Sequence, residues 1–209
     1  MKQLFTLFNL LASIMLYSQE FEGTVTYKMD YTIKSSELDL QELKKLMGTE
    51  AKTHFKDGFY LEKTDSDFMS YQLYSPKDTL VYYKNNIKSD TIKYNRVNTK
   101  TEEEFTYKIE KNTDTILGYK CDKLIFKDKY GIKTYYYSSE LSLDPEDYKF
   151  FLVSNKNKIV SLMKAIYLRL EMTFPAFTVD IIATEVKHTQ LKKSLFKLPK
   201  DHNLIDGNF

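Results

Sequence analysis

Residues 21–33 read FEGTVTYKMDYTI, and this stretch decides the fold class. Apolar side chains occupy every second position from Val25 to Ile33, and polar side chains stand between them. Successive side chains of a strand point to opposite faces, so the alternation predicts a long strand with one buried and one solvated face. Two further runs alternate in the same way, at 166–174 and 177–183. The chain is therefore predicted to be mainly β.

Short apolar runs separated by turn signals fill residues 50–138, with turns predicted at 57–58, 112–114 and 129–131. Strands this close in sequence pair antiparallel, because a parallel crossover needs about a dozen residues or more. The 17 tyrosines and 14 phenylalanines, with no tryptophan, suit strands better than helices. The strands predicted in this region are 68–74, 79–84, 105–110, 119–127 and 132–138.

Two short helices are predicted to interrupt the strands. Ser36 followed by Asp39 resembles a capping box, after which apolar residues recur at helical spacing at Leu40, Leu43 and Met47. Asp144 before Pro145 is typical of a second helix start, and this helix is predicted to run to about Val153. The predicted architecture is α+β: a strongly curved antiparallel sheet, or half-open β-barrel, with one or two short helices covering its concave face.

Residues 1–18 have the pattern of a cleaved secretory signal. Lys2 supplies a positive charge, an apolar stretch runs from Leu4 to Leu16, and Ser18 is the predicted last residue removed. The apolar stretch is shorter than the ~20 residues that span a bilayer, so a retained membrane anchor is the less favoured alternative. No cysteine stands near the cleavage point to carry a lipid. Residues 19–209 are predicted to form a single exported domain, periplasmic or extracellular, and not an integral membrane protein.

The charges are balanced and dispersed. The chain has 31 Lys and Arg against 29 Asp and Glu, with a formal net charge of +2. Nucleic-acid binding calls for a clustered basic face, so no nucleic-acid partner is predicted. Cys121 is the only cysteine, which excludes an intrachain disulfide.

The sequence carries no recognisable catalytic motif. His54, His188 and His202 lack metal-ligand spacing, so neither a metal site nor a cofactor is predicted. Cys121 stands near lysines that would activate a nucleophile, but a buried, apolar thiol is the favoured interpretation. There is no Gly-x-Ser-x-Gly elbow and no glycine-rich phosphate loop. The chain is predicted not to be an enzyme, with an unrecognised hydrolase as the open alternative.

The tyrosines cluster at 82–83 and 135–137. Neighbouring strand residues point to opposite faces, so part of each cluster faces solvent or a cavity. Such tyrosines can stack on sugar rings or contact a protein partner. The favoured alternative is that they pair across strands and hold the sheet together.

Three segments carry a family resemblance: FEGTVTY at 21–27, ILGYKCDK at 116–123, and the closing strands from 166 to 187 followed by LFKLPKD at 195–201. Together they resemble exported Bacteroidetes cell-envelope proteins with an uncharacterised domain related in shape to the lipoprotein carriers LolA and LolB. The chain lacks the Gly-Leu-Pro-Gly-Leu-Ile signature of a sister group, the GLPGLI family. The resemblance implies a half-open barrel whose concave sheet holds acyl chains, and a place in the periplasm.

These observations favour a non-catalytic periplasmic protein that binds a hydrophobic ligand, a lipid or an acyl chain, on the concave face. The alternative is an envelope protein–protein interaction module without a small-molecule ligand. Methionines among the apolar residues would adapt to a flexible chain, although an ordinary closed core would use the same residues. The predicted lining residues are Phe21, Val25, Tyr27, Met29, Leu40, Leu43, Met47, Ile166, Leu168, Leu170 and Met172.

Overall fold

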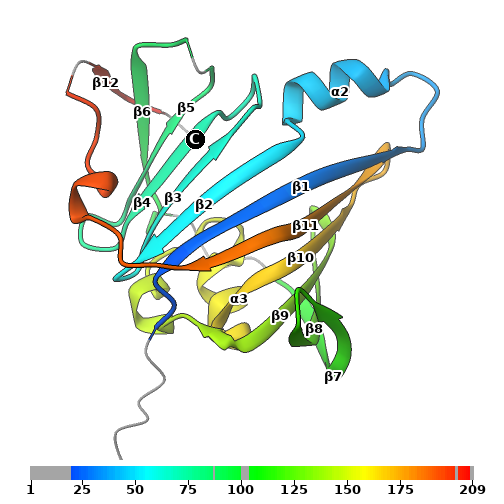
Figure 1. The fold of residues 1–209 in the computed structure, drawn as a ribbon. Coiled ribbons are helices and arrows are strands. Elements are labelled where there is room, and N and C mark those ends of the chain that lie inside the picture. Colours follow the sequence, from blue (N-terminus) through cyan, green and yellow to red (C-terminus); the bar gives the residue numbers. More distant parts are fainter. Residues whose placement is uncertain (1–19, 87, 100–103, 201, 208–209) are drawn as a thin grey trace, which may run out of the picture.

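The computed structural model describes residues 20–86, 88–99, 104–200 and 202–207. One curved, unclosed sheet of twelve strands dominates these residues, accompanied by two short α-helices (Figure 1). The predicted fold class, mainly β with a curved sheet and short helices, is confirmed. The predicted signal peptide, residues 1–18, lies outside the described residues.

The predicted runs correspond to β1, β4, β5 and β7 to β11, whereas no strand bounds were predicted for β2, β3, β6 and β12. β1 lies between β2 and β11, where it joins the two halves of the sheet. The order across the sheet is β12-β6-β5-β4-β3-β2-β1-β11-β10-β9-β8-β7. The strand bounds are β1 (Gly23–Ile33), β2 (Glu50–Lys56), β3 (Phe59–Thr64), β4 (Tyr71–Ser75), β5 (Leu80–Lys84), β6 (Thr91–Arg96), β7 (Thr106–Ile116), β8 (Tyr119–Asp128), β9 (Gly131–Ser142), β10 (Ala165–Thr173), β11 (Phe177–His188) and β12 (Asn203–Asp206).

Strand pairing is antiparallel except at one edge. The predicted turn at Asp57-Gly58 is confirmed, and both residues have the positive φ of a two-residue hairpin. β12 pairs with β6 in parallel, which the sequence did not predict. The reason is that β12 reaches β6 after the C-terminal segment has crossed the outer side of the sheet, and not through a hairpin.

Two strands depart from simple alternation. The predicted turn at 112–114 is wrong, because β7 continues through it with a bulge between Glu110 and Asp114. Asp122 on β8 stabilises this bulge by accepting hydrogen bonds from Lys111 Nζ at 2.7 Å and from the Asn112 backbone at 3.0 Å. The register of β10 against β9 also shifts on both sides of Tyr167. Such irregularities change which side chains face inward.

The helices are shorter than predicted. α2 (Leu40–Met47) begins at Asp39 and not at Ser36, because the Asp39 carboxylate accepts the backbone N–H groups of Gln41 and Glu42 at 2.8 and 2.9 Å. Asp144 caps a 3-10 turn, η1 (Pro145–Tyr148), which does not continue to Val153. The chain instead passes through η2 (Val153–Asn155) into α3 (Lys156–Met163). The sequence did not predict α3, whose start has no side-chain cap.

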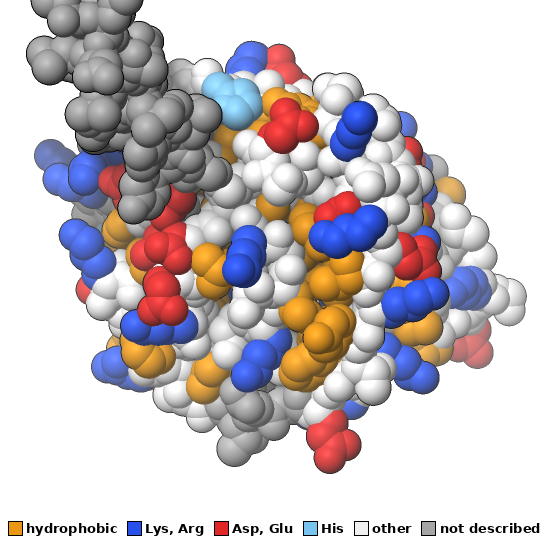
Figure 2. Space-filling model, turned by 90° about the horizontal axis from the view of Figure 1, so that it is seen from below, with side chains coloured by type: hydrophobic (Ala, Val, Ile, Leu, Met, Phe, Trp, Pro, Cys, Tyr) orange, Lys and Arg blue, Asp and Glu red, His pale blue; other side chains and the backbone are white. Residues whose placement is uncertain are grey.

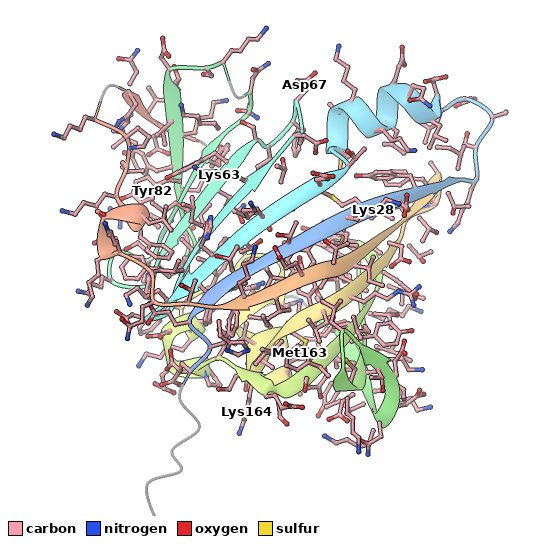
Figure 3. All side chains as sticks on the ribbon, viewed as in Figure 1. Lys28, Lys63, Asp67, Tyr82, Met163 and Lys164 are labelled. Atoms are coloured by element: carbon pink, nitrogen blue, oxygen red, sulfur yellow. The ribbon has the colours of Figure 1, made fainter. Side chains whose placement is uncertain are left out.

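Of the two α-helices in the described residues, α3 covers the concave side of the sheet. Its residues Ile159 and Met163 pack with Leu124 and Phe126 of β8. Met163 points toward the sheet, whereas the neighbouring Lys164 points away from it (Figure 3). α2 lies at the rim, beside the end of β1 (Figure 1). The prediction that one or two helices cover the concave face therefore reduces to one.

The outer side of the sheet is partly covered by the C-terminal segment. In η3 (Lys193–Phe196), Phe196 packs on Leu61 and Leu73, and its ring centre lies 5.8 Å from that of Phe59.

Seen from below, the surface carries small apolar groups separated by charged side chains (Figure 2). In the part of the chain that the structure describes, no helix is long and apolar enough to cross a membrane.

Candidate functional site

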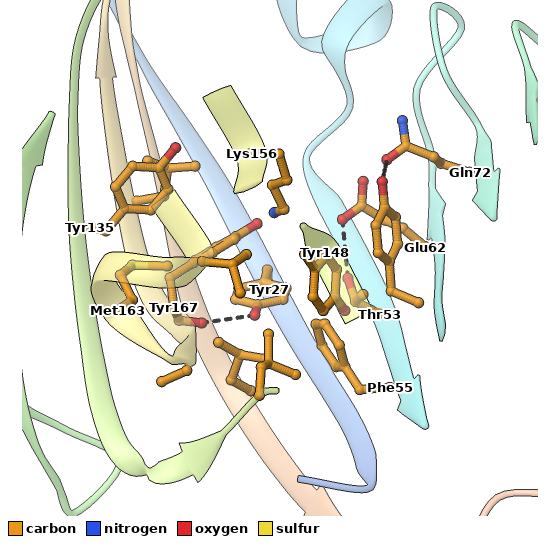
Figure 4. A pocket seen from close by; sticks show the side chains of 16 residues that line it. Tyr27, Thr53, Phe55, Glu62, Gln72, Tyr135, Tyr148, Lys156, Met163 and Tyr167 are labelled. Atoms are coloured by element: carbon orange, nitrogen blue, oxygen red, sulfur yellow. Dashed lines mark hydrogen bonds between the residues drawn. The ribbon is translucent and has the colours of Figure 1, made fainter. Parts of the chain in front are cut away.

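A cavity of about 200 Å³ lies inside the curve of the sheet. Strands β2, β3 and β4, with Tyr148 of η1 stacked on Tyr74 of β4, form one side of its wall, and β9, β10 and α3 form the other, with β1 between them (Figure 4). We call it the concave cavity. It is lined by Tyr27, Thr53, Phe55, Tyr60, Glu62, Gln72, Tyr135, Leu143, Tyr148, Lys156, Val160, Met163, Ala165, Ile166, Tyr167 and Leu170.

A row of polar side chains crosses one wall. Thr53, Glu62 and Gln72 are cross-strand neighbours on β2, β3 and β4, so all three point into the concave cavity. The Thr53 hydroxyl donates to Glu62 Oε2 at 3.1 Å, and the Tyr60 hydroxyl donates to Gln72 Oε1 at 2.6 Å. Burial raises the pKa of the Glu62 carboxyl, while the Thr53 hydrogen bond and the charge of Lys156 oppose that rise. This wall therefore offers a carboxyl group to a cavity that polar and apolar side chains line together.

Lys156 enters the concave cavity from the opposite direction. It is the first residue of α3 and follows Ser154 and Asn155, which both have left-handed backbone conformations. Figure 4 shows its ammonium between the wall that carries Glu62 and the wall that carries Tyr135 and Tyr167. Burial lowers the pKa of Lys156, and the attraction of Glu62 opposes this. Lys156 and Glu62 thus attract each other across the space without forming an ion pair in the described chain.

Five tyrosines contribute to the remaining wall. Tyr27 donates its hydroxyl to the Tyr167 carbonyl at 2.9 Å, and the two ring centres lie 5.1 Å apart. Tyr148 is only 1% exposed, and its hydroxyl has no partner among the described residues. Burial raises the pKa of Tyr27, Tyr148 and Tyr167, so these phenols stay protonated at neutral pH. They can donate hydrogen bonds and stack against a ring.

The structure divides the eleven predicted lining residues into two groups. Tyr27, Ile166 and Leu170 lie in the wall of the concave cavity. The other eight pack elsewhere. Phe21, Val25, Met29 and Leu168 lie in the core, and Met172 is partly buried against it. Leu43 lies on the buried side of α2, and Leu40 and Met47 lie on its partly exposed sides. The α2 residues lie away from the cavity because that helix lies at the rim.

Sequence reasoning missed the polar residues of the concave cavity. Tyr167 was predicted to face away from Leu170, but the bulge on β10 turns it inward. The position of Glu62 could have been found from strand alternation. It stands two residues after Tyr60 in β3, so the two side chains lie on the same inward face. Lys156 carries no comparable signal, because α3 itself was not predicted.

The other candidate reactive groups lie outside this wall. Cys121 is fully buried, as predicted for a structural thiol, and burial raises its pKa. The imidazole of His54 hydrogen-bonds Thr24 at 2.8 Å, and that of His188 hydrogen-bonds Tyr119 at 3.1 Å. Of the clustered tyrosines, Tyr135 faces the concave cavity, whereas Tyr136 lies under the Arg169 guanidinium at 5.3 Å on the outer side.

Comparisons with known proteins show structural likeness only. No protein-family model and no curated protein sequence matches the chain. The structure is similar to that of PNGF-II, with a TM-score of 0.49 and 13% identity over 88% of this chain and 31% of the other. It is also similar to the lipoprotein LppX of Mycobacterium tuberculosis, with a TM-score of 0.36 and 10% identity over 88% of this chain and 97% of the other. The chain spans about a third of PNGF-II. Both scores are too low to carry a function across, so the function rests on the site's own residues.

Proposed function

We propose that this protein is an exported, non-catalytic binding protein that shelters one small molecule in the concave cavity. The observation that carries the proposal is a space of about 200 Å³ in which Glu62, Lys156 and Tyr148 lack full partners in the described chain. Buried polar groups are normally satisfied, and isolated interior charges destabilise a fold. A ligand that completes these interactions explains why the fold keeps them.

The size of the concave cavity limits the ligand. A protein cavity of about 150 Å³ can hold one benzene molecule, and pockets for drug-sized ligands run to roughly 300–1,000 Å³. The concave cavity, at about 200 Å³, holds a single substituted ring or the end of a longer chain. We therefore narrow the expected lipid or acyl chain to a small ligand with an apolar body. Periplasmic location remains part of this proposal.

Support for a non-catalytic role comes from the groups present. The buried Cys121 thiol does not line the concave cavity, and burial raises its pKa, which disfavours the thiolate needed for nucleophilic attack. Glu62 and Lys156 come from opposite walls and face the same space, an arrangement that suits holding a ligand from two sides.

Native mass spectrometry of the protein exported by its own host tests the proposal. We expect a bound small molecule that Ala165→Leu abolishes, because Ala165 is fully buried in the cavity wall and a larger side chain would fill the space. Ala176→Leu, in the turn between β10 and β11, is the matched control and should retain the ligand. Leu170→Phe is a second filling variant should Ala165→Leu fail to fold.

Two results would overturn the proposal. One is wild-type protein that carries no small molecule and binds no ring-sized probe such as phenol in calorimetry. The other is a folded Ala165→Leu or Leu170→Phe variant that keeps the ligand unchanged. A bound lipid of full length would instead restore the broader expectation of an acyl-chain carrier and refute the size limit.

A further inference from the structure

Several groups that can donate a hydrogen bond face the concave cavity without a hydrogen-bond partner among the described residues, and one of them, the Lys156 ammonium, can only donate. The Lys156 ammonium forms no ion pair within the described chain, and its Nζ lies 5.9 Å from the centre of the Tyr60 ring. The Tyr148 hydroxyl is buried without a partner there. The hydroxyls of Tyr135 and Tyr167 also make no hydrogen bond to described residues. Four groups thus have donors to offer to a ligand.

The acceptors on the facing wall are largely occupied. Gln72 Oε1 accepts from Tyr60, and Glu62 Oε2 accepts from Thr53. The second carboxylate oxygen of Glu62 has no donor among the described residues. This free acceptor faces the Lys156 ammonium and the hydroxyls of Tyr135 and Tyr167 on the opposite wall, whereas the Tyr148 hydroxyl lies on the same side as Glu62.

We infer that the ligand is a ring-sized monocarboxylate with a hydroxyl group on the far side of the ring. Its carboxylate accepts from Lys156 and the nearby tyrosine hydroxyls, and its hydroxyl donates to Glu62. A single lysine neutralises one negative charge, whereas Glu62 repels a second, so a monoanion fits better than a dianion such as phosphate. The inference rests on the proposed function and names the ligand class for the same site.

The shape of the wall agrees with this ligand. The rings of Tyr27, Tyr60 and Tyr167 line the space between the two polar ends, and aromatic faces stack on flat rings and on the apolar faces of sugars. The same chemistry is found in hydroxyaromatic acids and in uronic acids. Both place a carboxylate and a hydroxyl on opposite sides of a six-membered ring.

Calorimetric titration of the full mature protein tests the inference with 4-hydroxybenzoate, glucuronate and unsubstituted benzoate. We expect one of the two hydroxy acids to bind, and its identity tells the aromatic source from the sugar source. Lys156→Met should weaken binding roughly 10- to 100-fold, the range for loss of a charged hydrogen bond. Glu62→Gln should weaken binding of the hydroxy acid relative to benzoate, because only the hydroxy acid donates to the Glu62 carboxylate. The exposed Lys120→Met and Glu37→Gln are matched controls and should change nothing.

The outcomes separate the inference from the proposed function. One outcome would overturn the inference and leave the proposed function standing: the protein binds neutral phenol, Ala165→Leu abolishes that binding, and neither acid binds. The inference would also be overturned if a folded Lys156→Met variant bound the hydroxy acid as tightly as the wild type does. If neither the acids nor phenol bound, both would fail. Lys156→Gln, which keeps a donor without the charge, provides a second variant if Lys156→Met does not fold.

Discussion

At the scale of single residues, Glu62 and Lys156 set the chemistry of the interior. Each is partly buried, and burial disfavours its charged form. Removing either group should therefore stabilise the fold while impairing ligand binding, a trade-off typical of functional sites. The double variant should not equal the sum of the single ones, because the two charges attract each other across the same space.

We expect Glu62→Gln to stabilise the protein by roughly 0.5–2 kcal/mol at pH 7 and to have little effect near pH 3. Burial raises the folded pKa of Glu62 above its ordinary value of 4.5. Below that value both states are protonated. As the pH rises through 4.5, the unfolded chain loses the proton while the folded protein keeps it, so the wild type loses stability until the pH passes the folded pKa. Urea unfolding across this range measures the difference.

The exposed Glu37→Gln serves as the control for that titration and should give no pH-dependent gain. A Glu62→Gln variant that is less stable than wild type at pH 7 would show that the carboxylate is well solvated or paired, against the view of an interior group short of partners.

At the scale of elements, the entry into α3 positions Lys156. Ser154 has φ 54° and Asn155 has φ 56°, so two residues other than glycine adopt the left-handed conformation in succession. This conformation is unfavourable by about 1 kcal/mol or more for a side chain with a Cβ. Asn155 is also buried, with its Nδ2 lacking a partner in the described chain. Such strain beside a binding residue is common at functional sites.

Ser154→Gly should stabilise the protein by about 0.5–1 kcal/mol, because glycine adopts the left-handed conformation without a steric penalty. The exposed Ser161 lies within α3 and offers the same substitution in a right-handed helix. There Ser161→Gly should destabilise by a similar amount. Thermal unfolding of the two variants should give opposite signs. Equal signs would mean that the turn into α3 is not strained.

At the scale of the whole molecule, the two halves of the sheet depend on different supports. α3 packs against β8 and β10 on the inner side of one half. The C-terminal segment packs against β3 and β4 on the outer side of the other half, where Phe196 covers Leu61 and Leu73. β3 and β4 also carry Glu62 and Gln72 on their inner face. The outer cover therefore helps to hold one wall of the concave cavity.

Phe196→Ala should destabilise the protein by about 3 kcal/mol, as expected for a large-to-small change at a buried aromatic side chain. Phe150 is 53% exposed, so Phe150→Ala is the matched control and should cost less than about 0.5 kcal/mol. Chemical denaturation compares the two free energies of unfolding. Similar values for both variants would show that the C-terminal segment does not support the sheet.

Much of the fold could be predicted because strand alternation is a local property. The runs around β1, β8, β9, β10 and β11 were each visible in a short window of sequence. The bulges at Asn112 and next to Tyr167 could not be predicted, since they depend on how neighbouring strands pair. α3 could not be predicted for a related reason. Its start has no side-chain cap, and packing against the sheet stabilises it.

The candidate site follows the same division. Tyr27, Ile166 and Leu170 could be chosen from alternation alone, but Glu62, Lys156 and Tyr148 could not. The amino-acid sequence by itself determined a curved, largely antiparallel sheet with an apolar inner face, because the period of the side chains records which face is buried. Only the tertiary structure decided that this face contains a small polar cavity. The curvature of the sheet and the bulge on β10 bring together residues that are distant in the chain, and neither leaves a local signal.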